Sequence, residues 1–337
     1  MLWGGCPGSF AVCYGETMAR RDGLLRGLSV LVVLCCVLES VGQANAKRDE
    51  NTPEFKLTLP VDEVVLMFHA ADAHGISIND LKKDEIRLWD NGIAPRRIVA
   101  FDSLIDRPIR VGFLLDASES MQRSLTASKQ IAGAFAQRIF RGKSDQGFVM
   151  PFGYASEVSV PWTSDSVVLT RGIRNVKEGS MNPLGGTALI DTIFRACFHS
   201  FGRADPASTA NLLVIFSDGE DNASHTTMDE ALHACQQSNT VIYAFRVPEE
   251  AGRYSTGPKT LAELTSKSGG RVFPADDTDE AIWNDLKTID SETRNQYRLV
   301  YDPAQLQHDG RFHSIEIQPP DRVSQIEVRT GYYAPKR

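Results

Sequence analysis

Two short apolar segments that each end at an aspartate constrain the fold of this chain most. Residues 111–115 (VGFLL) run directly into Asp116, and residues 212–216 (LLVIF) are followed within two positions by Asp218. Both segments have the length and composition of buried strands. A carboxylate at the end of a buried strand is unfavourable unless something pairs with it. The pattern therefore predicts a binding site at the ends of two strands.

Hydroxyl side chains accompany both aspartates. Ser118 and Ser120 follow Asp116 at alternate positions, so one turn of backbone can point three oxygen-bearing side chains at one spot, and Thr187 follows two glycines in a loop. With Asp218, these side chains are all hard oxygen donors, which suit Mg²⁺, Mn²⁺ or Ca²⁺ and argue against zinc. We interpret the five residues as metal ligands. The alternative is that the two aspartates only cap helices that follow their strands.

This set resembles the metal-ion-dependent adhesion site of the von Willebrand factor type A domain. The complete motif is matched in order by Asp116-x-Ser118-x-Ser120, then Thr187, then Asp218. The resemblance implies that the hydroxyls bind the ion directly or nearly so and that the aspartates bind it directly or through water. It also implies one coordination position left for a Glu or Asp of a protein partner. Mg²⁺ is the expected ion, with Mn²⁺ and Ca²⁺ as alternatives.

Alternating strand and helix patterns surround the motif. They predict an α/β domain with a doubly wound, mostly parallel sheet, in which ligands bind beyond the carboxyl ends of the strands. A hairpin from residues 148–152 and 157–162 adds one antiparallel edge strand. The helices are expected at residues 124–140, 188–201, 228–237, 261–268 and 279–293, and the remaining strands at residues 212–216, 241–247 and 271–274.

Short strand-like segments lie on both sides of this domain. We predict an N-terminal β flank at residues 55–106, a von Willebrand factor A domain at residues 107–295 and a C-terminal β flank at residues 296–337. Because a few short strands cannot bury two faces alone, the flanks are expected to form one small all-β sandwich. This order of segments, with a tail that contains RTGYYAP, resembles the exported acidobacterial von Willebrand A-related proteins.

The N-terminus has the pattern of an export signal. Residues 1–46 contain a basic segment, an apolar run too short to span a bilayer comfortably, and Ala44-Asn45-Ala46, which has the A-x-A form of a cleavage site. Met18 fits the start of such a signal better than Met1. Residues 47–54 are expected to be a flexible leader. We predict a secreted, periplasmic or envelope protein with no transmembrane segment after cleavage near Ala46, with an uncleaved anchor as the alternative.

Two cysteines belong to the expected mature chain, Cys197 and Cys235. Helical periodicity places each on the apolar face of its own helix, so we expect two buried thiols that face the sheet. Export makes a disulfide between them the alternative.

The net charge and the motifs of the chain argue against two classes of function, nucleic-acid binding and catalysis. A net charge of −7 argues against nucleic-acid binding. The nucleophile-elbow, zinc-protease, P-loop and dinucleotide-binding motifs are absent, so we expect no catalytic residues and no enzyme. The prediction is a non-enzymatic, adhesion-type protein that captures an acidic side chain of a protein partner through the metal. The alternatives are an envelope scaffold with a structural metal and a metal-assisted hydrolase.

Overall fold

The computed structural model of the chain describes residues 63–179, 181, 185–202, 207–248 and 255–336. The export signal, the Ala46 cleavage site and the leader at residues 47–54 lie outside this part, as do the first residues of the N-terminal flank. Every described residue belongs to the unit Thr58–Arg337. No helix in the described part is long and apolar enough to span a membrane.

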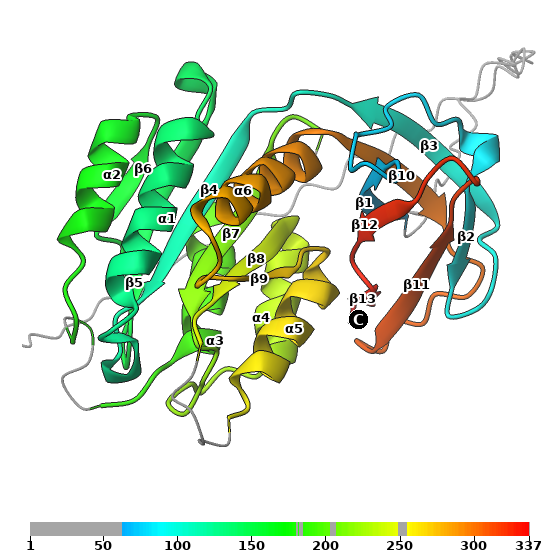
Figure 1. The fold of residues 1–337 in the computed structure, drawn as a ribbon. Coiled ribbons are helices and arrows are strands. Elements are labelled where there is room, and N and C mark those ends of the chain that lie inside the picture. The colour runs from blue at the N-terminus through cyan, green and yellow to red at the C-terminus, as the bar shows by residue number, and fades with distance from the viewer. Residues whose placement is uncertain (1–62, 180, 182–184, 203–206, 249–254, 337) are drawn as a thin grey trace, which may run out of the picture. The chain divides into compact units, whose positions relative to one another are not determined.

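A six-stranded sheet forms the centre of an α/β domain (Figure 1). All neighbouring strands are parallel except β6, which pairs antiparallel with β5 at one edge. The predicted fold class, including its antiparallel edge strand, is therefore confirmed. Across the sheet the strands are β6 (Val160–Thr163), β5 (Gln146–Phe152), β4 (Ile109–Asp116), β7 (Ala210–Ser217), β8 (Thr240–Arg246) and β9 (Val272–Pro274).

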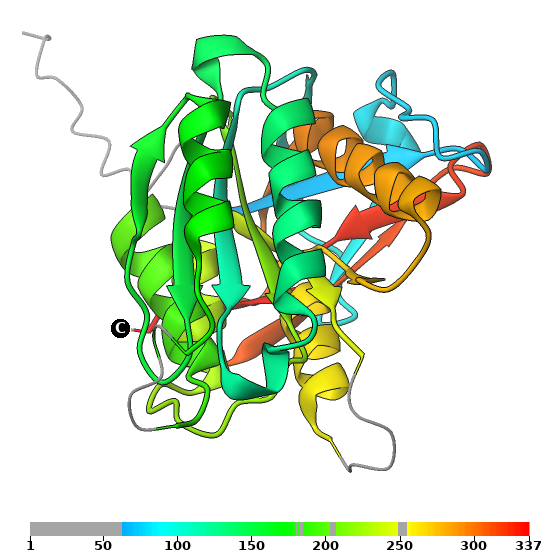
Figure 2. The same ribbon diagram turned by 60° about the vertical axis from the view of Figure 1, so that its left-hand side comes forward.

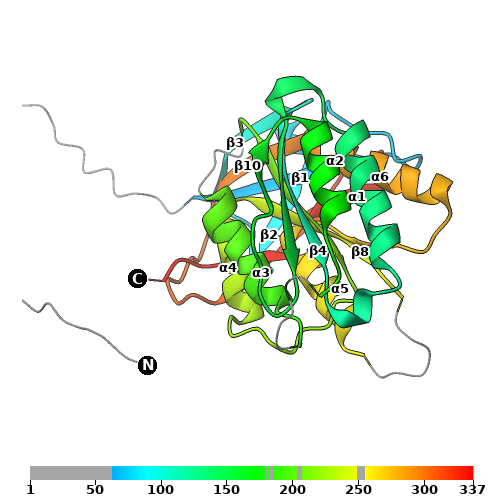
Figure 3. The same ribbon diagram turned by 90° about the vertical axis from the view of Figure 1, so that its left-hand side faces the viewer.

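Helices cover both faces of this sheet, as the view in Figure 3 shows. Successive side chains of a strand point to opposite faces: Val111, Phe113 and Leu115 of β4 pack with α1, α2 and α6, whereas Leu114 packs on the side of α3, α4 and α5. Burial on both faces explains the continuous apolar runs in the sequence. The helices are α1 (Leu125–Arg138), α2 (Ser166–Asn175), α3 (Leu189–Arg195), α4 (Met228–Gln237), α5 (Gly257–Ser268) and α6 (Asp279–Arg294).

The helix α2 was not predicted from the sequence. Its second and third residues are two exposed valines, Val167 and Val168, whose β-branched side chains favour strands. Asp165 decides the local structure, because its carboxylate accepts hydrogen bonds from the backbone N–H groups of both valines at 2.8 and 3.3 Å. This cap satisfies two donors that the first helical turn would otherwise leave unpaired.

Segments from both ends of the chain form the second part of the fold, beside the α/β domain (Figure 1). Two antiparallel sheets share one apolar core, to which Leu66, Leu88, Leu299 and Ile315 contribute, as the prediction of a small all-β sandwich requires. One sheet consists of β12 (Gln325–Val328), β1 (Val64–Ala71), β10 (Gln296–Asp302) and β3 (Arg97–Leu104). The other consists of β13 (Gly331–Tyr333), β11 (Phe312–Gln318) and β2 (Arg87–Asp90).

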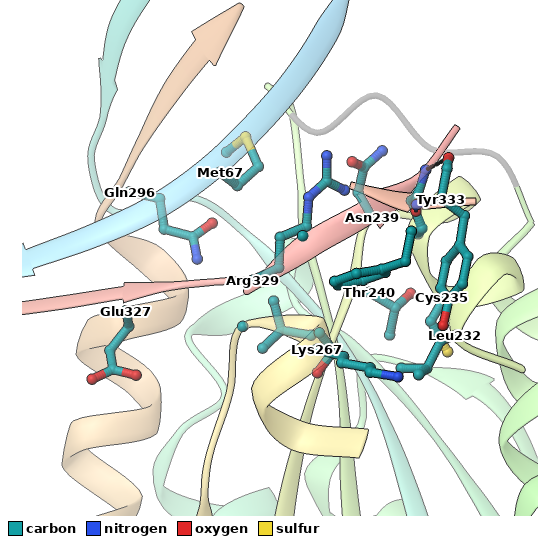
Figure 4. Close-up of a pocket in the computed structure, with 16 residues that line it drawn as sticks. Met67, Leu232, Cys235, Asn239, Thr240, Lys267, Gln296, Glu327, Arg329 and Tyr333 are labelled. Atoms are coloured by element: carbon teal, nitrogen blue, oxygen red, sulfur yellow. Dashed lines mark hydrogen bonds between the residues drawn. The ribbon is translucent and has the colours of Figure 1, made fainter. Parts of the chain in front are cut away.

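The β sandwich and the α/β domain are in direct contact. Gln236 of α4 donates to the carbonyl oxygen of Tyr333 at 3.0 Å and accepts from its N–H at 2.7 Å. A cavity of only about 40 Å³ remains beside this contact, between Lys267 of the α/β domain and Arg329 of the sandwich (Figure 4). The small volume shows that the two parts are closely packed here.

One arginine pairs with two carboxylates where the β sandwich contacts the α/β domain. Arg271 forms ion pairs with Glu292 of α6 and with Glu327 of β12, and Glu292 also accepts a hydrogen bond from the Tyr243 hydroxyl at 3.2 Å. Burial raises the pKa of Glu292 to about 7; Arg271 opposes this shift and Glu327 adds to it. The contact between the two parts therefore contains a carboxyl group, that of Glu292, that titrates near neutral pH.

We expect the variant Glu292→Gln to gain stability relative to the wild type as the pH rises. Below about pH 4.5 the Glu292 side chain is protonated in both states and contributes nothing. Between about 4.5 and about 7 only the unfolded chain loses the proton, so the group increasingly favours unfolding, and above this range the penalty is constant. Urea unfolding at about pH 5 and about pH 8 checks this. An unchanged difference between variant and wild type would contradict it; Glu280→Gln, at an exposed position of the same helix, is the control.

Cys197 and Cys235 form a disulfide, so the expectation of two free thiols is wrong. Their Cα atoms lie 4.8 Å apart, on helices that pack side by side on one face of the sheet. The chain continues from α3 as a π-helix, Ala196–Phe201. Both cysteines lie in the apolar core on this side of the sheet, as periodicity predicted, but the close approach of the two helices depends on their packing, which periodicity does not specify.

Removing this disulfide should lower the free energy of unfolding by about 2–4 kcal/mol, because the bridge closes a loop with a sequence separation of 38. The measurement is urea unfolding of the double variant Cys197→Ala, Cys235→Ala beside the oxidised wild type. Reductant should destabilise the wild type and leave the variant unchanged. Equal stability of the oxidised and reduced wild type would contradict the expectation.

Candidate metal site

Asp116 is the last residue of β4, and its side chain is completely buried. One carboxylate oxygen accepts the Ser118 N–H at 3.0 Å and the other accepts the Ser217 hydroxyl at 2.6 Å. Ser217 ends the neighbouring strand β7. Burial raises the pKa of Asp116 to about 6, and the charge of Asp218 acts in the same direction. The carboxylate is therefore held in one orientation and lies near a second negative charge.

The two serines lie on a tight turn after β4. Ser118 precedes the 3-10 helix Glu119–Met121, and its Oγ lies 3.2 Å from Oγ of Ser120. The structure thus brings the two predicted hydroxyl ligands together. Ser118 is buried and Ser120 is exposed, so the pair lies where the core meets the surface.

Thr187 is held by the loop that follows β7. Its N–H donates to the side-chain oxygen of Asn222 at 2.8 Å, and its carbonyl oxygen accepts from the N–H groups of Asn222 and Ala223, both at 3.0 Å. Gly186 precedes it with φ +94°, and a Cβ at this position would lie 2.9 Å from the Asn222 side-chain oxygen. The approach of the two loops therefore requires a glycine here.

Asp218 directly follows β7 and is mostly buried. One of its carboxylate oxygens accepts the Glu220 N–H at 3.0 Å. Gly219 has φ +86°, and a Cβ there would lie 2.4 Å from the carbonyl oxygen of Gly257. Neither aspartate caps the helix that follows it: the N-cap of α1 is Ser124, and that of α4 is Thr227.

A cavity of about 590 Å³ lies where these loops meet, beyond the carboxyl ends of the central strands, which point to the lower end of Figure 2. Four of the five predicted ligands line it: Ser118, Ser120, Thr187 and Asp218. Asp116 does not line it and is bonded to the wall residue Ser118 from within the core. Glu119, Arg123, Glu220 and Asn222 are among the other lining residues.

The donor set fits a hard divalent cation. In the part of the chain that is described, no three His, Cys, Asp or Glu side chains gather as a metal site, so hydroxyls would have to complete the coordination. The described residues also form no ion pair with Asp116 or Asp218. Two neighbouring carboxylates that form no ion pair with another described residue, beside three hydroxyl oxygens, are what a cation such as Mg²⁺ would stabilise.

Two further acidic residues near the site stabilise the loops instead. The Glu220 carboxylate accepts the N–H groups of Thr256 and Gly257 at 2.8 and 3.1 Å, at the start of α5, and the Ser255 hydroxyl is the main cause of its lowered pKa. Asp221 accepts the Ile190 N–H at 2.7 Å. Both carboxylates therefore connect the loop after β7 to the start of a helix.

Sequence reasoning also missed Ser217 and Asn222, which orient Asp116 and Thr187. Ser217 could have been found from its position in the sequence, between a predicted strand and the predicted ligand Asp218. Asn222 gave a weaker signal, because side-chain amides commonly bond to nearby backbone groups in loops, whereas this one bonds to a residue 35 positions away.

The sequence between residues 111 and 291 matches the family model of the von Willebrand factor type A domain. The match covers more than half of the chain and includes all five predicted ligands. The chain belongs to this family. No curated protein matches the sequence.

The solved structures that resemble this chain are distant from it in sequence. The conserved hypothetical protein BatB from Bacteroides thetaiotaomicron is 18% identical over 54% of this chain and 97% of its own, with a TM-score of 0.45. An aerotolerance-related membrane protein from Bacteroides fragilis is 18% identical over 55% of this chain and 98% of its own, with a TM-score of 0.44. Proximal thread matrix protein 1 from the mussel byssus, in a structure with a zinc-occupied MIDAS motif, is 17% identical over 61% of this chain and 50% of its own. Its TM-score is 0.46. This chain thus spans half of the mussel protein.

Proposed function

We propose that this von Willebrand factor A protein is an exported, non-enzymatic binding protein that captures an acidic side chain of a protein partner through a divalent cation. The observation that carries the proposal is the convergence of Ser118, Ser120, Thr187 and Asp218 on one open cavity, with buried Asp116 behind them. A bound cation would supply a positively charged coordination position for a carboxylate oxygen of the partner.

The five predicted ligands would contribute different properties to cation binding. Asp116 and Asp218 supply the negative charge that attracts the cation, and the hydroxyls of Ser118, Ser120 and Thr187 supply neutral oxygens. Because only two ligands are charged, a bound Mg²⁺ would keep its affinity for a further carboxylate. The cavity of about 590 Å³ leaves room for a side chain of the partner.

Catalysis is not part of the proposal. Among the lining residues that the structure describes, there is no His, Cys or Lys that could act as a general base or nucleophile. Of the two lining glutamates, Glu220 already accepts hydrogen bonds at the start of α5, and Glu119 is exposed.

Export is supported by the disulfide between Cys197 and Cys235, because such bridges persist in oxidising compartments. If cleavage follows Ala46, protein secreted from a bacterial host should begin at Lys47. Intact-mass measurement decides this. A mass that includes the apolar run before Ala46 would support the anchored alternative instead.

The function is tested by capturing partners from the cell envelope of the source organism with the wild type and with the variant Asp116→Asn as baits, with and without chelator. We expect a partner that the wild type retains in Mg²⁺, releases in chelator and rebinds when Mg²⁺ returns. Replacing the contacting Glu or Asp of that partner should abolish the interaction. A partner that stays bound in chelator, and binds both baits equally, would favour the scaffold in which the metal is structural.

The identity of the ion is a separate measurement. Hard oxygen ligands favour Mg²⁺, Mn²⁺ or Ca²⁺, but Zn²⁺ generally binds a given site more tightly than Mn²⁺ does. Calorimetric titration with all four ions, each at equal ionic strength, identifies the ion that this site binds most tightly.

A further inference from the structure

Two loops supply the hydroxyl of Thr187 and the carboxylate of Asp218, and hydrogen bonds join these loops to each other. Asn222 makes the central contact: its side-chain oxygen accepts the Thr187 N–H, and its own N–H donates to the Thr187 carbonyl oxygen. The peptide groups on both sides of Thr187 are therefore bound by one residue. Asn222 lies four positions after Asp218, so the contact connects one predicted ligand to the other.

The starts of α3 and of the loop before α4 also cap each other. Asp221 accepts the Ile190 N–H at 2.7 Å, and the Ser224 hydroxyl oxygen accepts the Asp191 N–H at 3.0 Å. In return, the Asp191 carboxylate accepts the N–H groups of His225 and Thr226, at 3.1 and 2.7 Å. Hydrogen bonds in both directions thus join the two segments at this end.

Packing leaves little freedom at the central contact. A Cβ on Gly186 would meet the Asn222 side-chain oxygen at 2.9 Å and the Ala223 Cβ at 3.3 Å. Moreover, Asn222 lines the cavity while its side-chain oxygen is bound to Thr187. Its side-chain oxygen is therefore already held in place by the Thr187 N–H.

From these contacts we propose that Asn222 is a positioning residue of the metal site. It holds Thr187 at a set place relative to Asp218 before a cation binds, so that cation binding does not have to order the loop. The inference rests on the proposed function, because it assumes that Thr187 and Asp218 are ligands. Outer residues that orient metal ligands typically contribute about 10- to 100-fold to metal affinity. We expect a loss of this size in Asn222→Ala.

The experiment compares the wild type, Asn222→Ala, and Asp191→Ala as a matched control. Asp191→Ala also removes hydrogen bonds between the same two loops, but at positions that do not touch Thr187. Calorimetry with Mg²⁺ and Mn²⁺ measures affinity, and urea unfolding measures stability. Hydrogen exchange of the Thr187 amide is followed in the metal-free protein. If Asn222→Ala does not fold, Asn222→Ser takes its place, because its shorter side chain also removes the contact.

The expected result is a 10- to 100-fold weaker cation affinity in Asn222→Ala, together with faster exchange of the Thr187 amide, and a change below about threefold in Asp191→Ala. Equal affinity in Asn222→Ala and wild type would overturn the inference and leave the proposed function intact. Affinity losses that follow the stability losses in both variants would also overturn it, because they would show a general structural effect. A folded wild type that binds neither of these ions, nor Ca²⁺ or Zn²⁺, would overturn the proposed function and this inference together.

Discussion

Replacing Arg294 with alanine is expected to lower the free energy of unfolding by about 3–5 kcal/mol, the largest loss of stability that we predict for a single substitution. Arg294 is the last residue of α6, and its side chain is 2% exposed. The guanidinium group donates to both carboxylate oxygens of Asp145, at 3.1 and 2.6 Å, and Asp145 is completely buried. Removing the cation leaves this carboxylate in the core without its countercharge.

The same guanidinium also binds two further segments of the chain. It donates to the carbonyl oxygens of Ile139, after α1, and Arg107, before β4, at 2.8 and 2.9 Å. Because α6 continues directly into β10, these bonds hold the α/β domain at the point where the chain enters the β sandwich. Arg294→Lys should recover little of the loss, since a single ammonium group cannot form the two parallel bonds to a carboxylate.

Urea unfolding of Arg294→Ala, beside Arg298→Ala, checks this prediction. Arg298 also forms a two-bond contact with a carboxylate, that of Asp102, but both side chains are about one-third exposed or more. Exposed ion pairs contribute about 0–1 kcal/mol. Similar losses in the two variants would show that burial of the Arg294 pair does not determine its contribution.

The sequence identified the central sheet because its strands are apolar on both faces. The runs that end at Asp116 and Asp218 are such strands, and helical periodicity located α1, α4, α5 and α6 within a few residues. Local patterns failed where a single contact decides the structure. Val167 and Val168 favour a strand until Asp165 caps them, and β13 is only a short segment whose Tyr333 pairs with Gln236 of α4.

The candidate site was visible in the sequence for a different reason. Metal ligands must carry donor atoms, and Asp116, Ser118 and Ser120 occupy a spacing that brings such atoms together within one turn. The groups that orient the ligands have no such restriction. Ser217 bonds to Asp116 from 101 positions away, and the disulfide partner of Cys197 lies 38 positions along the chain. Contacts of this kind depend on how helices and strands pack, which periodicity does not specify.

Replacing Asp116 or Asp218 with asparagine is expected to abolish detectable binding of Mg²⁺ and Mn²⁺. Each substitution removes one of the two charges that attract the cation. Asparagine is preferable to alanine at position 116, because alanine would leave the Ser118 N–H and the Ser217 hydroxyl without their acceptor in the core, at about 1–3 kcal/mol. Asparagine keeps the shape and one oxygen acceptor. The fold should therefore persist in both variants.

The stability of the metal-free protein separates loss of a ligand from loss of structure. In the wild type, burial and the charge of Asp218 both disfavour ionised Asp116, so the neutral variants should be as stable as the wild type without metal, or slightly more stable. At a Mg²⁺ concentration 100 times its Kd, the wild type should gain about 2.7 kcal/mol and the two variants nothing. Calorimetric titration and thermal unfolding with and without Mg²⁺ measure both effects, with Asp279→Asn, on the exposed first turn of α6, as the control. If either variant binds Mg²⁺ as tightly as the wild type, the corresponding aspartate is not a ligand. If both variants lose stability in the absence of metal, the carboxylates serve the fold, and the placement of two carboxylates at the ends of β4 and β7 needs another explanation.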